Sequence, residues 1–119
     1  MYVNDILYED LIELLAIVYM NIPWHKIKTS KNAYDIFNHR VRAAARRGTI
    51  NEFISKLCNY FSLQSLPLET QELIERLRPY EREVLSRLER EHIAFSVYAI
   101  ARAKELKKKN KEKEGSVND

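Results

Sequence analysis

The chain has 119 residues, of which 45% are hydrophobic and 31% charged, and its formal net charge is +3. This composition is typical of a soluble globular protein, and the length suffices for one compact core but not for two. Two glycines and three prolines leave few positions for tight turns, which favours an all-α fold. The single cysteine, Cys58, excludes an internal disulfide and indicates a reducing compartment.

The first predicted helix covers residues 4–21, where apolar side chains recur every three or four positions and acids occupy the other side. Asn4 is its expected N-cap, and Pro23 ends it. The longest apolar stretch, residues 14–20, is too short to span a bilayer, and no basic and apolar leader precedes it. We therefore expect a cytoplasmic protein with no membrane partner.

A loop or single turn over residues 23–29 leads into a second predicted helix, which begins with Ser30 as its cap and ends near residue 47. A helical wheel places the apolar residues of this helix in one arc, and its cations opposite that arc or beside it. Lys31, His39, Arg42 and Arg46 fall on the opposite arc, and Arg40 and Arg47 flank the apolar side.

Three more helices are expected in the second half of the chain. Thr49 and Glu52 have capping-box spacing after Gly48, so a third helix spans about residues 49–62, with Phe53, Leu57, Tyr60 and Phe61 as its apolar face. A fourth helix covers residues 67–78. A single long helix then follows from Pro79, and its apolar run at residues 93–103 is expected to be the central strut of the fold.

These elements predict a compact bundle of about five helices in one domain, residues 1–108. The lysine-rich segment 109–119 has almost no apolar side chain to bury, so we expect a flexible, partly disordered tail there.

The charge distribution is the main indication of function. Residues 25–47 hold seven of the chain's twenty basic side chains and one acid, Asp35, so this stretch carries +6 while the rest of the chain carries −3. Such a concentration favours binding to a polyanion, and the backbone of single-stranded DNA or RNA is the expected partner. The predicted contacts are Lys26, Lys28, Lys31, Arg40, Arg42, Arg46 and Arg47.

Trp24 lies within this basic stretch, and two interpretations of it are open. Its ring can offer a stacking platform for an unpaired base, or it can plug the core between helices. The cationic helix face has a plain alternative as well, which is an ordinary solvated surface that happens to lack acids. Arginines after residue 75 alternate with glutamates at helical spacing, so we expect most of them to form pairs within their helices.

No pattern indicates catalysis or a cofactor. His25, His39 and His92 stand in three separate segments without metal-ligand spacing, and Cys58 has no base nearby in the sequence. The glycine-rich loop of a nucleotide-binding enzyme is also missing. We therefore predict a protein that is not an enzyme and has no metal site.

A small, basic, all-helical chain with an arginine-rich second helix and a lysine-rich end resembles the small subunit of an archaeal type I-A CRISPR interference complex. The abundance of Lys, Arg and Glu also fits a thermophilic source. The resemblance implies a non-catalytic subunit in a crRNA-containing protein complex. Several copies would stack against one another there and help to hold target or displaced DNA strands.

Two other functions are compatible with the same residues. The second and third helices, joined through Gly48, are loosely similar to a helix-turn-helix, which would imply a dimeric transcription regulator with base preference. Alternatively, the protein is a helical adaptor whose basic surface meets an acidic protein, and it then binds no nucleic acid.

Overall fold

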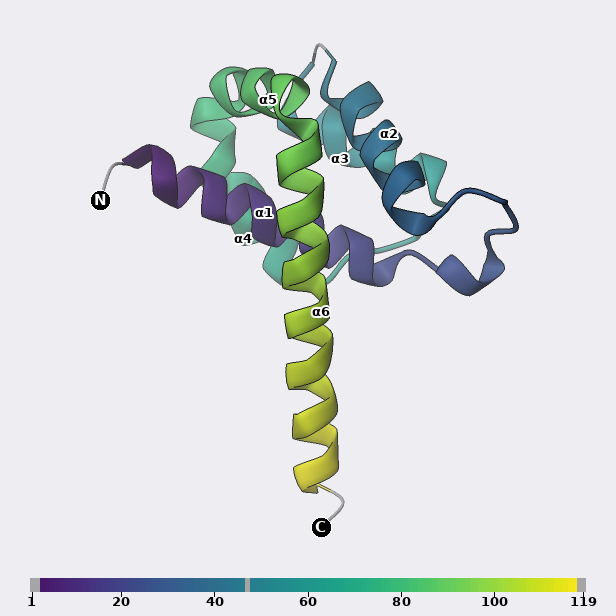
Figure 1. Cartoon of the computed structure of the whole chain (residues 1–119). Helices are drawn as coiled ribbons and strands as arrows, with labels where there is room; N and C mark the ends of the chain where they lie inside the picture. The colour runs from purple at the N-terminus through teal and green to yellow at the C-terminus, as the bar shows by residue number, and fades with distance from the viewer. Residues whose placement is uncertain (1–2, 47, 118–119) are drawn as a thin grey trace.

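The computed structural model describes residues 3–46 and 48–117, with side chains described for residues 6–46 and 48–110. All regular elements in these ranges are helical, which confirms the predicted all-α class (Figure 1). In chain order they are α1 Val3–Asn21, the 3₁₀ turn η1 Trp24–Lys26, α2 Ala33–Ala45, α3 Ile50–Tyr60, α4 Glu69–Leu77, the 3₁₀ turn η2 Arg78–Tyr80, α5 Glu81–Arg90 and α6 His92–Val117.

Helix α1 is the centre of the fold. Leu11, Leu14, Leu15 and Val18 have no exposed surface, and the helix packs against both α4 and α6, which crosses it (Figure 1). Burying an aliphatic side chain of this size stabilises the folded state by about 1.5–3 kcal/mol, so this buried row is a main source of stability. Of the acids of α1 whose side chains are described, Glu9 is exposed, and Asp10 and Glu13 contact arginines of α4 and α6.

Helix α6 buries less of its apolar run than the sequence predicted. Of its first three turns only one stripe is buried, formed by Phe95, Ser96 and Ala99. The neighbouring side chains of Ile93, Val97 and Tyr98 are 50–59% exposed. Helix α6 packs against α1, α2 and α5, but only one side of it faces the bundle, and the helix then extends beyond it (Figure 1).

The predicted second helix is shorter at both ends. Its N-cap is Asn32, whose Oδ1 accepts from the backbone N–H of Asp35 at 2.8 Å, rather than Ser30. At the other end Arg46 leaves helical geometry with ψ of 117°. Gly48 then takes a φ of +132°, a backbone region that L side chains rarely adopt. Consequently Lys31 and Arg46 lie outside α2, and a helical wheel does not apply to them.

Both ends of α3 follow local rules. Thr49 Oγ1 accepts from the backbone N–H of Glu52 at 3.1 Å, as the capping-box spacing predicted. At the C-terminus the backbone N–H of Leu63 donates to the carbonyl of Cys58, and Ser62 has a φ of 56°. This pattern is a Schellman motif with serine in the position that glycine usually takes.

The single final helix predicted from Pro79 is two helices. η2 and α5 occupy residues 78–90, and the chain turns at Glu91, whose φ and ψ are −117° and 32°, before α6 begins. Figure 1 shows α5 lying across the end of α6 rather than continuing it. No proline or glycine marks this turn, so the sequence contained no local signal for it.

The lysine-rich end of the chain continues the ribbon of α6 away from the body as far as Val117 (Figure 1). The expected flexibility of residues 109–119 stays a prediction. None of the helices in the described part of the chain has both the length and the apolar composition needed to span a membrane.

Candidate nucleic-acid interface

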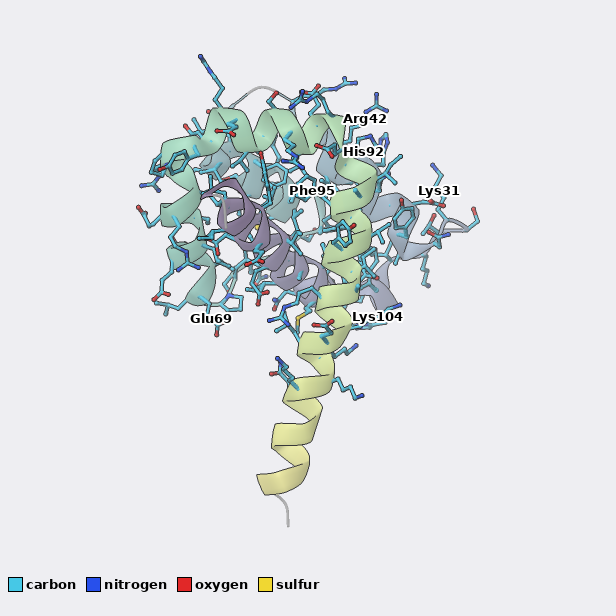
Figure 2. The ribbon with its side chains drawn as sticks, turned by 60° about the vertical axis from the view of Figure 1, so that its left-hand side comes forward. Lys31, Arg42, Glu69, His92, Phe95 and Lys104 are labelled. Atoms are coloured by element: carbon cyan, nitrogen blue, oxygen red, sulfur yellow. The ribbon has the colours of Figure 1, made fainter. Side chains whose placement is uncertain are left out.

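The predicted cations separate into a group beside a groove and a group at the other end of α2. Lys26, Lys28, Lys31 and Arg40 line the groove, whereas Arg42 lies near the start of α6 and Arg46 just after α2. Figure 2 shows Lys31 out on the loop before α2 and Arg42 beside His92. The single face expected from the helical wheel was therefore wrong, because the loop carries its lysines to one side of α2 only.

The groove, called here the basic groove, has a volume of about 760 Å³. Its walls come from the loop with η1, the first two turns of α2 and the end of α3. Its lining residues are Pro23, Lys26, Ile27, Lys28, Thr29, Lys31, Asp35, Ile36, His39, Arg40, Tyr60, Phe61 and Ser62. Four cations and His39 thus surround an apolar floor, and Asp35 is the one acid among the lining residues.

Arg40 and Tyr60 contact each other at this groove. The guanidinium carbon of Arg40 lies 3.3 Å from the centroid of the Tyr60 ring, a cation–π arrangement. Tyr60 remains 48% exposed, although the sequence placed it on the apolar face of its helix. The prediction that Tyr60 lies on the apolar face was wrong, because the buried position belongs to its neighbour Phe61. Two consecutive aromatic side chains diverge by about 100° on a helix, and only Phe61 reaches the core.

On the opposite side of α2, Asn38 joins this helix to α6. Its Oδ1 accepts from Ser96 Oγ at 2.9 Å and lies 2.9 Å from His92 Nδ1. Because an amide oxygen can only accept, Nδ1 carries a proton in this arrangement. Partial burial and the nearby positive charge of Arg42 lower the pKa of His92, so the ring is held in its neutral form.

Two further candidates differ in what the structure shows. The side chain of Arg46 is exposed, and its backbone carbonyl accepts a hydrogen bond from Lys56 Nζ at 3.5 Å. Arg47 lies outside the described residues, so its placement stays a prediction.

Trp24 fits the core interpretation better than the stacking one. Its ring packs against Tyr19 and Phe61, with centroid distances of 5.0 and 5.7 Å, and its Nε1–H donates to the carbonyl of Tyr19 at 3.1 Å. Both the ring and its polar atom are therefore engaged within the protein. Tyr60 and Phe61, and not Trp24, are aromatic side chains that line the groove.

Ion pairing distinguishes these cations from four of the arginines in the second half of the chain. Lys26, Lys28, Lys31, Arg40, Arg42 and Arg46 form no ion pair within 4.0 Å with any carboxylate among the described side chains. In residues 76–102, Arg76, Arg78, Arg87 and Arg102 each contact an acid, whereas the exposed Arg82 and Arg90 form no such pair with a described side chain. The positive charge around α2 is therefore not neutralised by direct pairs.

The described side chains contain no group of three or more His, Cys, Asp or Glu that can hold a metal ion. Burial raises the pKa of the Cys58 thiol, which favours the protonated form over the nucleophilic thiolate.

Comparison with protein-family models, with curated proteins and with solved structures found no match to this chain. The function is therefore inferred from the charges, contacts and shape of the chain's own side chains.

Proposed function

We propose that this protein is a non-catalytic nucleic-acid-binding protein that holds a phosphate backbone through the cations of the basic groove and the end of α2. The observation that supports this most is that six cations without ion-pair partners among the described side chains lie in a stretch, residues 25–47, whose one acid is Asp35. Arg82 and Arg90 of α5 are also unpaired in the described part of the chain, but they stand among glutamates. Surface cations without carboxylate partners create a local positive potential, which attracts phosphate groups and releases their counterions on binding.

The chemistry of the individual side chains is consistent with this role. Lysine supplies a compact, mobile charge for a phosphate, and an arginine supplies a planar fork that matches two phosphate oxygens. Lys26, Lys28 and Lys31 are exposed on the loop, and Arg42 and Arg46 are exposed at the other end of the helix. A backbone that follows the surface of α2 meets both groups, which extends the contact beyond one phosphate.

The test is a salt titration of nucleic-acid affinity with a matched control. Lys26→Glu combined with Lys28→Glu is expected to weaken binding of labelled single-stranded DNA at least about tenfold at low salt. The double variant Arg82→Glu/Arg90→Glu changes the net charge by the same amount on exposed positions of α5. It should change affinity by less than about threefold.

The slope of log affinity against log salt gives a second measure. Each phosphate contact contributes about −0.7 to this slope for a single strand, so the loop variant should have a shallower slope than the wild type. Equal losses in the loop and α5 variants would mean that only net charge matters, and the proposed surface would then be wrong. No binding at low salt by the wild type would reject the function itself.

The resemblance to the small subunit of a type I-A CRISPR complex leads to a more specific proposal. In it, several copies of the chain bind within a crRNA-containing complex in the cytoplasm and contact target or displaced DNA. Isolation of the native protein followed by sequencing of any bound RNA tests this. CRISPR repeat sequence is expected among the RNA, and its absence from a purified native complex would count against the assignment.

The adaptor alternative is supported by one observation, the exposed apolar side chains Ile93, Val97 and Tyr98 on α6. A protein that serves only as an adaptor binds no nucleic acid at low salt. The helix-turn-helix alternative would place α3 in the major groove, and it predicts a clear preference for one duplex sequence. A selection from random duplexes without enrichment would exclude that role.

A further inference from the structure

The shape of the basic groove indicates more than an attraction to phosphate. A flat or convex cationic surface suffices to bind a duplex backbone, but this surface is hollowed. Its volume of about 760 Å³ falls within the range of pockets that bury small organic ligands. The groove therefore has room for a group that leaves the backbone and enters the protein.

The interior of the groove suits a planar, largely apolar group. Ile27, Ile36 and Phe61 contribute apolar surface, and all three belong to or pack against the hydrophobic core. Their positions are therefore fixed by packing rather than by solvent. The lysines of the groove, in contrast, are exposed. Exposed cations are suited to contact the phosphates that flank a planar group bound in the groove.

The Arg40–Tyr60 pair supplies a stacking surface at this groove. With the guanidinium 3.3 Å from the ring centroid on one face, Tyr60 is held in place while much of its surface stays exposed. Its ring also contacts Phe61 edge-on, at a centroid distance of 5.0 Å and an interplanar angle of 90°. An aromatic side chain fixed by two neighbours loses little further conformational freedom when a ligand stacks on it.

We infer that the basic groove binds an unpaired nucleobase of a single strand, stacked on Tyr60 and Arg40, with the adjacent phosphates on Lys26, Lys28 and Lys31. This inference rests on the proposed nucleic-acid-binding function and adds that the protein binds a base of the single strand as well as its phosphates. Asp35, the one acid lining the groove, provides an acceptor for an amino group of the base or a sugar hydroxyl. Bases within a duplex are already stacked and paired, so only an unpaired strand offers a free base face.

The experiment compares the affinity of the protein for a labelled single strand of twelve thymidine nucleotides with its affinity for a labelled twelve-base-pair duplex at the same salt concentration. The wild type should bind the strand at least about tenfold more tightly than the duplex. Tyr60→Leu removes the ring but keeps an apolar side chain, and it should weaken strand binding about tenfold. The same variant should leave duplex binding within about twofold, because no charge is changed.

Tyr60→Phe is the matched control, since it retains the ring and removes only the hydroxyl. It should bind the strand within about twofold of the wild type. Circular dichroism and thermal unfolding of all three proteins show whether Tyr60→Leu has kept the fold, as its exposed position predicts.

The outcomes of this experiment distinguish the base-binding groove from the proposed phosphate-binding function on which it rests. Duplex binding as tight as strand binding, or equal weakening of both by Tyr60→Leu, overturns the base-binding groove and leaves the phosphate-binding function in place. An unchanged affinity of Tyr60→Leu for the strand overturns it as well. A wild-type protein that binds neither nucleic acid rejects the proposed function and this inference together.

Discussion

The cations around α2 carry the same charge as Arg76, Arg87 and Arg102 of α4–α6 but differ from them in what they contact. Arg76 pairs with Asp10 at 2.9 Å and Arg102 pairs with Glu13 at 2.7 Å, so α4 and α6 are each linked to α1. Arg87 pairs with Glu91 within the turn between α5 and α6. These three arginines are held by carboxylates, whereas around α2 five described cations are exposed and Arg40 lies over the Tyr60 ring.

This difference separates structural charges from charges available to a ligand. A cation already paired with a carboxylate offers a phosphate little net gain, because the existing contact must be replaced. The helix α2 does not need such pairs, since Phe37 and Val41 are fully buried and Asn38 supplies the polar link to α6. Its cations can therefore change without loss of the fold, which the following predictions test.

The largest effect on stability is expected from Asn38→Ala. It leaves the buried hydroxyl of Ser96, which is 0% exposed, and Nδ1 of His92 without their acceptor. Loss of a buried acceptor costs about 1–3 kcal/mol of unfolding free energy, which urea denaturation measures. Asn51→Ala, at an exposed position of α3, is the control and should change stability by less than about 0.5 kcal/mol. A small effect at Asn38 would mean that α2 is held by its apolar side alone.

A smaller effect is expected from the pair of Arg102 and Glu13. Both side chains are about 30% exposed, so solvent screening limits their coupling to about 0.5–1 kcal/mol. A double-mutant cycle with Arg102→Met and Glu13→Gln measures this value.

Lys28→Gln removes a cation of the basic groove and should change unfolding free energy by less than about 0.5 kcal/mol. Comparable losses at Lys28 would contradict the division into structural and available charges.

The smallest effect concerns pH. Burial, and then the charge of Arg42, lower the pKa of folded His92 below its unfolded value of about 6.5. The unfolded chain therefore binds more protons between these two values, and the contribution of His92 to stability is lost as pH falls below about 6.5. The slope from one such group stays under about 1.4 kcal/mol per pH unit.

Arg42→Gln tests the cause of this shift. Removal of the neighbouring charge should raise the pKa of His92 in an NMR titration and reduce the loss of stability in acid. His92→Gln should abolish this component of the pH dependence altogether. If Arg42→Gln leaves the titration of His92 unchanged, the cation at that end of α2 does not act on the ring.

Local sequence determined most of the secondary structure. The amphipathic spacing of residues 4–21 and the cap at Thr49 both depend on neighbours within a few positions, and both were predicted. Such signals act over one turn of helix, so they can be seen without the fold. The turn at Glu91 was missed because the residues around it are good helix formers, and tertiary contacts of α6 with α2 accompany the change of direction.

The concentration of positive charge was likewise determined by the sequence, because it is a property of composition along residues 25–47. Which of those cations lie together was decided only by the tertiary structure. The loop carries Lys26 and Lys28 beside Arg40, and the end of α3 brings Tyr60 to the same groove. These residues belong to different elements and are too far apart in the sequence to share one face of a single helix. Only the packing of α2 against α3 and the path of the loop bring them together.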